Sequence, residues 1–230
     1  MIAIMGALDG EISEFLTVLE NRKEETWTDF TFYTGVLENK NVIVTKSGVG
    51  KVMTALVTQR IIDQYNPTII IFTGLAGSLG PQLDIGDTLV AADCIQHDLN
   101  AIPLGFKRGE IPYSPYRIFT CDKGLVDLAL KCVPENGKVV KGRILTGDQF
   151  ITNKTLKSFQ YFCNELAGDA VEMEGAAMAL VATINKLPFL LIRVISDRAD
   201  AYAHIDFKSF LPKASRNSLH FIRHVLRGLS

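Results

Sequence analysis

Long apolar runs that end on acidic side chains constrain the fold of this chain more than any other feature. The segment 189–195, Phe-Leu-Leu-Ile-Arg-Val-Ile, leads directly into Ser196 and Asp197. A β-strand that is buried on both faces, as in a parallel sheet covered by helices, has such a continuous apolar sequence. A second apolar segment ends at Glu172 and Glu174 and opens an alanine-rich helix. Because ligands bind beyond the carboxyl ends of strands in open α/β sheets, we expect Glu174 and Asp197 to lie at the functional edge of neighbouring strands.

Strand-like and helix-like segments alternate along the chain. Strands are expected at residues 2–5, 31–37, 41–46, 68–73, 88–94, 139–146 and 189–195. Helices are expected at about residues 12–19, 52–65, 124–132, 153–163, 174–185 and 207–229. A chain of 230 residues is long enough for one large α/β domain. We therefore predict a single domain over residues 1–230, with a three-layer α/β/α fold and a central mixed β-sheet.

The charge and hydropathy of the chain exclude several classes of function. The net charge is −1, which gives no electrostatic basis for binding nucleic acid or an anionic membrane. No apolar stretch reaches the ~18 residues that a membrane-spanning helix needs. The first residues carry no basic segment typical of a signal peptide, and the four cysteines lie far apart. We expect a soluble cytoplasmic protein whose thiols are buried and reduced.

No metal or cofactor site is predicted. His220 and His224 are four residues apart on the last expected helix and could both contact a metal ion. No acidic third ligand accompanies them, so we expect them on a helix surface.

Two glycine-rich segments follow expected strands. Residues 47–51 (Ser-Gly-Val-Gly-Lys) and 74–80 (Gly-Leu-Ala-Gly-Ser-Leu-Gly) match neither the P-loop nor the dinucleotide-binding fingerprint. Taken alone, each is typical of a tight turn. Their place at strand ends also suits a ligand site, because backbone N–H groups there can contact ligand oxygens.

Six short motifs in a fixed order carry a resemblance to a known family. They are Met5-Gly-Ala7 with Glu11, Lys46-Ser-Gly-Val-Gly-Lys51, Thr73-Gly-Leu-Ala-Gly77, Gly147-Asp-Gln-Phe150, Val171-Glu-Met-Glu174 and Arg193-Val-Ile-Ser-Asp197. With these motifs the chain resembles the bacterial 5′-methylthioadenosine/S-adenosylhomocysteine nucleosidases of the nucleoside phosphorylase superfamily, over about residues 1–226. The resemblance implies a homodimer of nucleoside phosphorylase-like subunits. It also implies hydrolysis of the adenine–ribose bond by water, without a metal or cofactor.

The resemblance assigns the chemistry to three acids. Asp197 matches the acid that protonates N7 of the leaving adenine, which suits a bond cleavage that leaves negative charge on the base. Glu174 matches the residue that binds the ribose 2′ and 3′ hydroxyls, since a carboxylate accepts two hydrogen bonds. Glu11 matches the general base that activates water. From the residues alone, Asp197 could also cap a helix and Glu174 could complement a helix dipole. Glu11 could equally be a surface acid, with Asp9 and Glu14 as rival candidates.

Further positions implied by the resemblance surround the substrate. They are Val49, Leu75, Phe150, Ile151, Glu172, Met173, Arg193 and Ser196, with Leu104 and Pro112 reaching across the dimer interface to the pocket for the 5′-substituent. Phe150 and Ile151 match positions that stack on adenine and bond to it through backbone groups, and Met173 matches a contact under the ribose. Arg193 lies inside an apolar strand and needs an anionic partner if buried, which Glu11 or Glu174 could supply.

Two other functions stay open. A phosphorylase of the same superfamily would need a phosphate cradle, to which Ser47 and Gly48 could belong, but no arginine cluster accompanies them. A non-enzymatic binding module would have no use for a base and an acid. Leu75 stands where many relatives have serine, and Leu104 where several have an aromatic residue. The preferred 5′-substituent is therefore open, and 5′-deoxyadenosine and aminodeoxyfutalosine stay candidate substrates.

Overall fold

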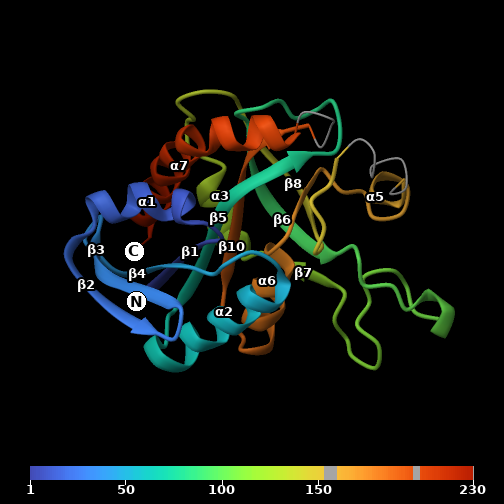
Figure 1. The fold of residues 1–230 in the computed structure, drawn as a ribbon, viewed down its shortest axis with the longest axis horizontal. Helices are drawn as coiled ribbons and strands as arrows, with labels where there is room; N and C mark the ends of the chain where they lie inside the picture. Colours follow the sequence, from blue (N-terminus) through green and yellow to red (C-terminus); the bar gives the residue numbers. More distant parts are fainter. Residues whose placement is uncertain (153–159, 199–202, 230) are drawn as a thin grey trace.

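The strands of the structure, a computed structural model, form one mixed β-sheet (Figure 1). The structure describes residues 1–152, 160–198 and 203–229. Within them the strands are β1 Ile2–Gly6, β2 Glu20–Trp27, β3 Phe30–Leu37, β4 Lys40–Lys46, β5 Ile69–Ser78, β6 Thr88–Gln96, β7 Ile118–Thr120, β8 Val139–Thr146, β9 Ala170–Glu172 and β10 Phe189–Asp197. Their hydrogen-bonded order is β10-β6-β8-β9-β5-β1-β4-β3-β2, with β7 paired to β6.

Helices cover both faces of this sheet. The described helices are α1 Asp9–Val18, α2 Lys51–Tyr65, the 3₁₀ turn η1 Ile102–Leu104, α3 Lys123–Ala129, α5 Tyr161–Asn164, α6 Gly175–Ile184 and α7 Ala203–Gly228. Figure 1 shows α1, α3 and α7 on one side of the strands and α2 with α6 on the other. This arrangement confirms the predicted three-layer α/β/α fold. No helix in the described part of the chain is long and apolar enough to cross a membrane.

Five strands close into a ring beside the open part of the sheet. β5 is parallel to β10 from Ile70 to Gly77 and pairs on its other edge with β9 at Gly77 and Ser78. β10 pairs with β6, β6 with β8, and β8 with β9, which completes the circuit. The first half of β5 pairs instead with β1, so the open sheet and the ring share this strand. Because the strands share one continuous sheet, we keep the prediction of a single domain over residues 1–230.

The hydrophobic pattern of α1 explains how this helix packs. Ile12, Phe15 and Leu19 are buried in the main core, as their spacing predicts, and Leu16 is half-buried against it. β10 shows the other pattern, because every residue from Phe189 to Asp197 is buried. The strand lies between β5 and β6 and packs against α7 and α3 on one side of the sheet and α6 on the other, so neither of its faces meets water.

Several expectations about the strands were wrong. The segment that begins at Gly74 is not a turn, because β5 continues through Gly77 to Ser78 and keeps its pairing with β10. Glu174 and Asp197 do not follow neighbouring strands, since β5 lies between β9 and β10. β2 and β7 were not predicted at all. Residues 153–159 of the helix expected at 153–163 lie outside the described residues, and Tyr161–Asn164 forms α5.

Candidate functional site

A cavity of about 250 Å³ lies at the carboxyl ends of β1, β5, β9 and β10. Loops that follow β4 and β8 complete its wall. Its lining residues are Ala7, Leu8, Glu11, Val49, Leu75, Ala76, Gly77, Gln149, Phe150, Ile151, Val171, Glu172, Met173, Glu174, Ser196 and Asp197. The lining is mainly apolar, with carboxylates at separate points. This is the usual composition of a site for a small organic ligand.

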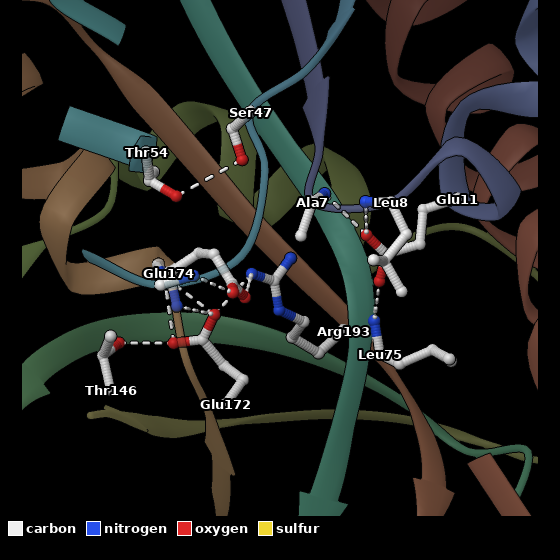
Figure 2. A network of polar contacts seen from close by, with 12 residues as sticks. Ala7, Leu8, Glu11, Ser47, Thr54, Leu75, Thr146, Glu172, Glu174 and Arg193 are labelled. Atoms are coloured by element: carbon white, nitrogen blue, oxygen red, sulfur yellow. Dashed lines mark hydrogen bonds and ion pairs between the residues drawn. The ribbon is translucent and has the colours of Figure 1, made fainter. Parts of the chain in front are cut away.

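Glu11 is held in the wall by backbone N–H groups from two segments. Ala7 and Leu8 donate to its Oε2 at 2.6 and 3.1 Å, and Leu75 donates to its Oε1 at 2.9 Å (Figure 2). The bond to Leu8 is also a capping contact, because Glu11 lies in the first turn of α1 and Leu8 is the N-cap residue. A Cβ atom at Gly74 would lie 2.5 Å from Oε1, so only glycine lets the carboxylate approach β5 so closely.

The structure separates Glu11 from its rivals on the same helix. Glu11 is 6% exposed, whereas the side chain of Asp9 is 82% exposed and that of Glu14 is 32% exposed. Burial raises the pKa of Glu11 above its ordinary value, although the charge of Arg193 and the three N–H groups oppose the shift. A buried carboxylate of raised pKa is a stronger base than an exposed one.

Arg193 lies beneath the cavity and pairs with Glu172. Its guanidinium donates to Oε2 of Glu172 and lies 3.9 Å from Oε2 of Glu174, between these acids and Glu11 in Figure 2. It also stacks on the Phe72 ring, 4.5 Å from the ring centre. Sequence reasoning offered Glu11 or Glu174 as its partner and did not consider Glu172, which makes the hydrogen bond.

The Glu172 carboxylate binds Arg193 and also the backbone N–H groups at the start of α6. Its carboxylate accepts N–H groups from Glu174 at 3.1 Å and Gly175 at 2.7 Å, and the Thr146 hydroxyl donates to it. A carboxylate at a helix N-terminus satisfies N–H groups that have no partner within the helix. The helix-dipole role considered for Glu174 is therefore performed by Glu172.

Glu174 keeps its carboxylate for the cavity. It is the N-cap residue of α6, and its Oε1 accepts the N–H of Gly50 at 2.8 Å. Gly50 is the N-cap residue of α2. Burial, and after it the charge of Glu172, raise the pKa of Glu174 to about 8. Arg193 and the Gly50 N–H act in the opposite direction. Gly50 contributes through its backbone, which sequence reasoning could not assign.

Asp197 ends β10 on another part of the wall. The Ser196 hydroxyl donates to its Oδ2 at 2.7 Å, and both residues are buried. The helix-cap role considered for Asp197 concerns residues 199–202, which lie outside the described residues. Phe150 is 45% exposed at the mouth of the cavity, so a planar ligand could stack on its ring.

The structure brings together most of the expected site residues. Ten of them line the cavity, namely Glu11, Val49, Leu75, Phe150, Ile151, Glu172, Met173, Glu174, Ser196 and Asp197. Arg193 lies behind the wall. Leu104 and Pro112 belong to the segment between β6 and β7, which Figure 1 shows extending away from the body of the chain, and they do not line this cavity.

Sequence reasoning missed part of the lining. Ala7, Leu8, Ala76, Gly77, Gln149 and Val171 also face the cavity. Each lies within or next to one of the six motifs, and that position was the available signal. Most of them are small or apolar, so their side chains suggest no chemistry. Among the described residues, no group of three potential metal ligands is found.

The comparisons with known proteins agree with this geometry. The family model described as the phosphorylase superfamily matches residues 1–227. A 5′-methylthioadenosine/S-adenosylhomocysteine nucleosidase of Bacillus cereus is 37% identical over 232 residues, which cover 99% of this chain and 99% of that protein. One of Staphylococcus epidermidis is 36% identical over 234 residues, the full length of both chains.

Solved structures show the same likeness. The 5′-methylthioadenosine/S-adenosylhomocysteine nucleosidase of Neisseria meningitidis, in complex with methylthio-immucillin-A, superposes with a TM-score of 0.93 at 32% identity and covers 99% of both chains. The futalosine hydrolase of Helicobacter pylori superposes with a TM-score of 0.92 at 34% identity, over 99% of this chain and 97% of that one. The 5′-methylthioadenosine/S-adenosylhomocysteine nucleosidases are hydrolases of N-glycosidic bonds, and the chain therefore belongs to this family within the phosphorylase superfamily.

Proposed function

We propose that the protein hydrolyses the N-glycosidic bond of 5′-methylthioadenosine and S-adenosylhomocysteine, releasing adenine and the 5′-substituted ribose. One observation carries this proposal: Glu11, Glu174 and Asp197 reach a single cavity from three different elements and have different hydrogen-bond partners. Carboxyl groups in separate environments can take separate roles as base and acid. The names of the relatives supply the substrate class.

Glu11 is proposed to activate the attacking water. Three N–H groups fix its carboxylate, so little reorganisation is needed when a proton is taken up. Glu174 is proposed to bind the ribose hydroxyls, from the start of α6. Asp197 is proposed to protonate N7 of the departing adenine. Phe150 and Ile151 are proposed to bind the base, and Met173 the ribose.

Water suits this cavity better than phosphate as the nucleophile. The lining residues that the structure describes include neither lysine nor arginine. The Ser47 hydroxyl, a candidate for a phosphate cradle, donates to the Gly48 carbonyl and lies 3.3 Å from the Thr54 hydroxyl (Figure 2). An ionised Glu11 would also repel a phosphate dianion. Because a futalosine hydrolase is among the similar structures, aminodeoxyfutalosine stays an alternative substrate. 5′-Deoxyadenosine stays a second alternative.

We also propose a homodimer that works in the cytoplasm. Apolar side chains are exposed on α2, where Val52 is 79% exposed, and on the segment between β6 and β7, where Leu104 is 69% exposed. Covering such side chains with a second copy removes apolar area from water. In the proposed dimer Leu104 and Pro112 line the partner's 5′ pocket. The described cysteines are free, which fits a reducing compartment, although Cys163 is exposed and the expectation that all four thiols are buried was wrong for it.

Replacing Asp197 by asparagine should abolish most adenine release while the fold is kept. Asparagine has nearly the same size and can still accept the Ser196 hydroxyl, but it cannot donate a carboxyl proton. A general acid contributes about 10²- to 10⁴-fold to a rate, so kcat for methylthioadenosine should fall by at least about 100-fold. Nitrophenyl riboside, whose leaving group needs no proton, should lose less. Near-wild-type release of adenine by the variant would refute the role of Asp197.

Turnover should proceed in phosphate-free buffer and should yield a free sugar. Mass spectrometry of the products distinguishes this sugar from a sugar 1-phosphate. Glu11→Gln should lose about 100-fold or more in kcat, because the amide cannot take a proton from water, while adenine binding measured by calorimetry persists. Glu14→Gln, on the same helix but outside the cavity, is the control. Phosphate-dependent turnover would place the protein among the phosphorylases.

The protonation of Glu174 should appear in the pH dependence of stability. Its pKa is about 8 in the folded chain and near 4.5 as an ordinary side chain. Between these values the folded chain binds more protons than the unfolded chain, so this group's contribution to stability is lost as pH rises towards 8. Glu174→Gln removes the effect. The free energy of unfolding of the variant, relative to wild type, should therefore increase from pH 5 to pH 8 by on the order of 3 kcal/mol.

Urea unfolding at each pH measures this difference, with Glu24→Gln on the exposed face of β2 as the control. A difference that stays constant over the whole pH range would show that Glu174 titrates normally.

Leu104→Asp should weaken the proposed dimer and raise KM for thioether substrates more than for adenosine. A charge placed in an apolar interface must be desolvated, which opposes association. Val133→Asp is the matched control, because Val133 is 79% exposed, against 69% for Leu104, but lies after α3, outside the segment from β6 to β7. Sedimentation velocity and steady-state kinetics provide the two measurements. A fully active wild-type monomer would refute the shared pocket.

A further inference from the structure

Lys51 connects three segments that are far apart in the sequence. It is the first residue of α2, and its ammonium group lies 2.6 Å from Oδ1 of Asp98 and 3.6 Å from Oδ2 of Asp148. Its backbone N–H donates to Oδ1 of Asp148 at 2.9 Å. Asp98 follows β6 and Asp148 follows β8, and the N–H of Asp148 donates to Oδ2 of Asp98 at 2.9 Å. The three residues thus form a closed set of contacts, in which the backbone N–H of Asp148 makes the link to Asp98.

This Lys51 cluster, made of Lys51, Asp98 and Asp148, borders the cavity on two sides without lining it. Asp148 is followed directly by Gln149, Phe150 and Ile151, which form one wall. Lys51 is preceded by Gly50, whose N–H donates to Glu174. A displacement of the cluster would therefore move both a wall of the cavity and the donor that Glu174 uses.

We propose that Lys51 is a positioning residue, whose contacts with Asp98 and Asp148 hold the 147–151 loop and the Gly50 N–H in the arrangement that substrate binding requires. The inference rests on the proposed function, because it concerns the same cavity. It assigns a role to a charged side chain that does not line the cavity and that had no role in the sequence analysis.

The charges of the Lys51 cluster explain why the lysine is needed. Two carboxylates flank one ammonium group, and the side chains of Lys51 and Asp98 are only 19% and 25% exposed. Although burial opposes it, hydrogen bonds from Lys51 and from the Asp148 N–H hold the pKa of Asp98 below its ordinary value. His97 supplies no replacement cation, because burial lowers its pKa to about 4. Without Lys51, the carboxylates of Asp98 and Asp148 would repel each other, and the 147–151 loop would move away from Asp98.

Gly50 makes the arrangement sensitive to the backbone. Its φ is +91°, a conformation that glycine adopts readily and other residues rarely do. The contacts on Lys51 hold this turn from the carboxyl side, and the Glu174 carboxylate holds it through the N–H. Loss of the Lys51 contacts would leave the turn held by Glu174 alone.

The test compares wild type with Lys51→Met, Lys51→Arg and the control Lys123→Met. Lys123 also pairs with a carboxylate, that of Asp127, but its side chain is 87% exposed and remote from the cavity. Methionine keeps most of the length of lysine without its charge. Lys51→Arg keeps the charge and the donors, so it should recover part of the lost function.

Hydrogen–deuterium exchange of peptides that cover residues 145–152 is the first measurement, and it requires no substrate. Lys51→Met should speed exchange there by about tenfold, while peptides from β5 and β10 stay as in wild type. Kinetics with methylthioadenosine are the second measurement. KM should rise about three- to tenfold and kcat should fall by a similar factor, because one wall and the ribose-binding acid are both displaced.

A role in folding alone gives a different result. It would reduce the amount of active protein, and so the apparent kcat, but would leave KM unchanged. Wild-type KM together with wild-type exchange in Lys51→Met would overturn the proposal, as would equal effects in Lys123→Met. If Lys51→Met does not fold, the same measurements on Asp98→Asn decide, since that change removes the partner charge. If wild type itself releases no adenine, the proposed function fails, while the exchange result still tests Lys51.

Discussion

The buried guanidinium of Arg193 is the group on which the whole site depends. It is 1% exposed and lies in β10 opposite Gly74 of β5, the strand that the ring shares with the open sheet. A buried cation is stable only with anionic partners, and Glu172 provides the direct one. Its positive charge also acts on Glu11 and Glu174, where it lowers the pKa of each carboxyl group. Burial raises the pKa values of Glu11 and Glu174, and the charge of Arg193 opposes this shift without cancelling it.

The strands buried on both faces could be predicted closely from the sequence. The segment 189–195 forms most of β10 because every position there must be apolar to avoid burying a polar group, and Arg193 is the exception that has its own partner. The pairing of strands could not be predicted in the same way. Local sequence does not show that β9 attaches to the far edge of β5, so the separation of Glu174 from Asp197 by β5 appeared only in the structure.

The acids of the site could be proposed from motifs, whereas their partners could not. Glu11 accepts N–H groups from Ala7 and Leu75, neither of which has a polar side chain. Leu75 is 64 residues from Glu11 in the sequence and reaches the carboxylate only after folding. Backbone donors leave no chemical trace in a sequence. The same holds for Gly50 beside Glu174. Residues that line the cavity with small apolar side chains were missed for this reason.

The ring of strands has a consequence for how the chain avoids unwanted association. In a ring each strand has a partner on both sides, so β5, β8, β9 and β10 offer little free edge to another molecule. The open sheet ends at β2, whose sequence Glu-Asn-Arg-Lys-Glu-Glu-Thr-Trp is exposed along nearly all of its length. Charged side chains on an edge strand discourage pairing with a second sheet and thus aggregation. β2 could not be predicted because its sequence has no hydrophobic pattern. The same charged sequence protects this edge from pairing with another sheet.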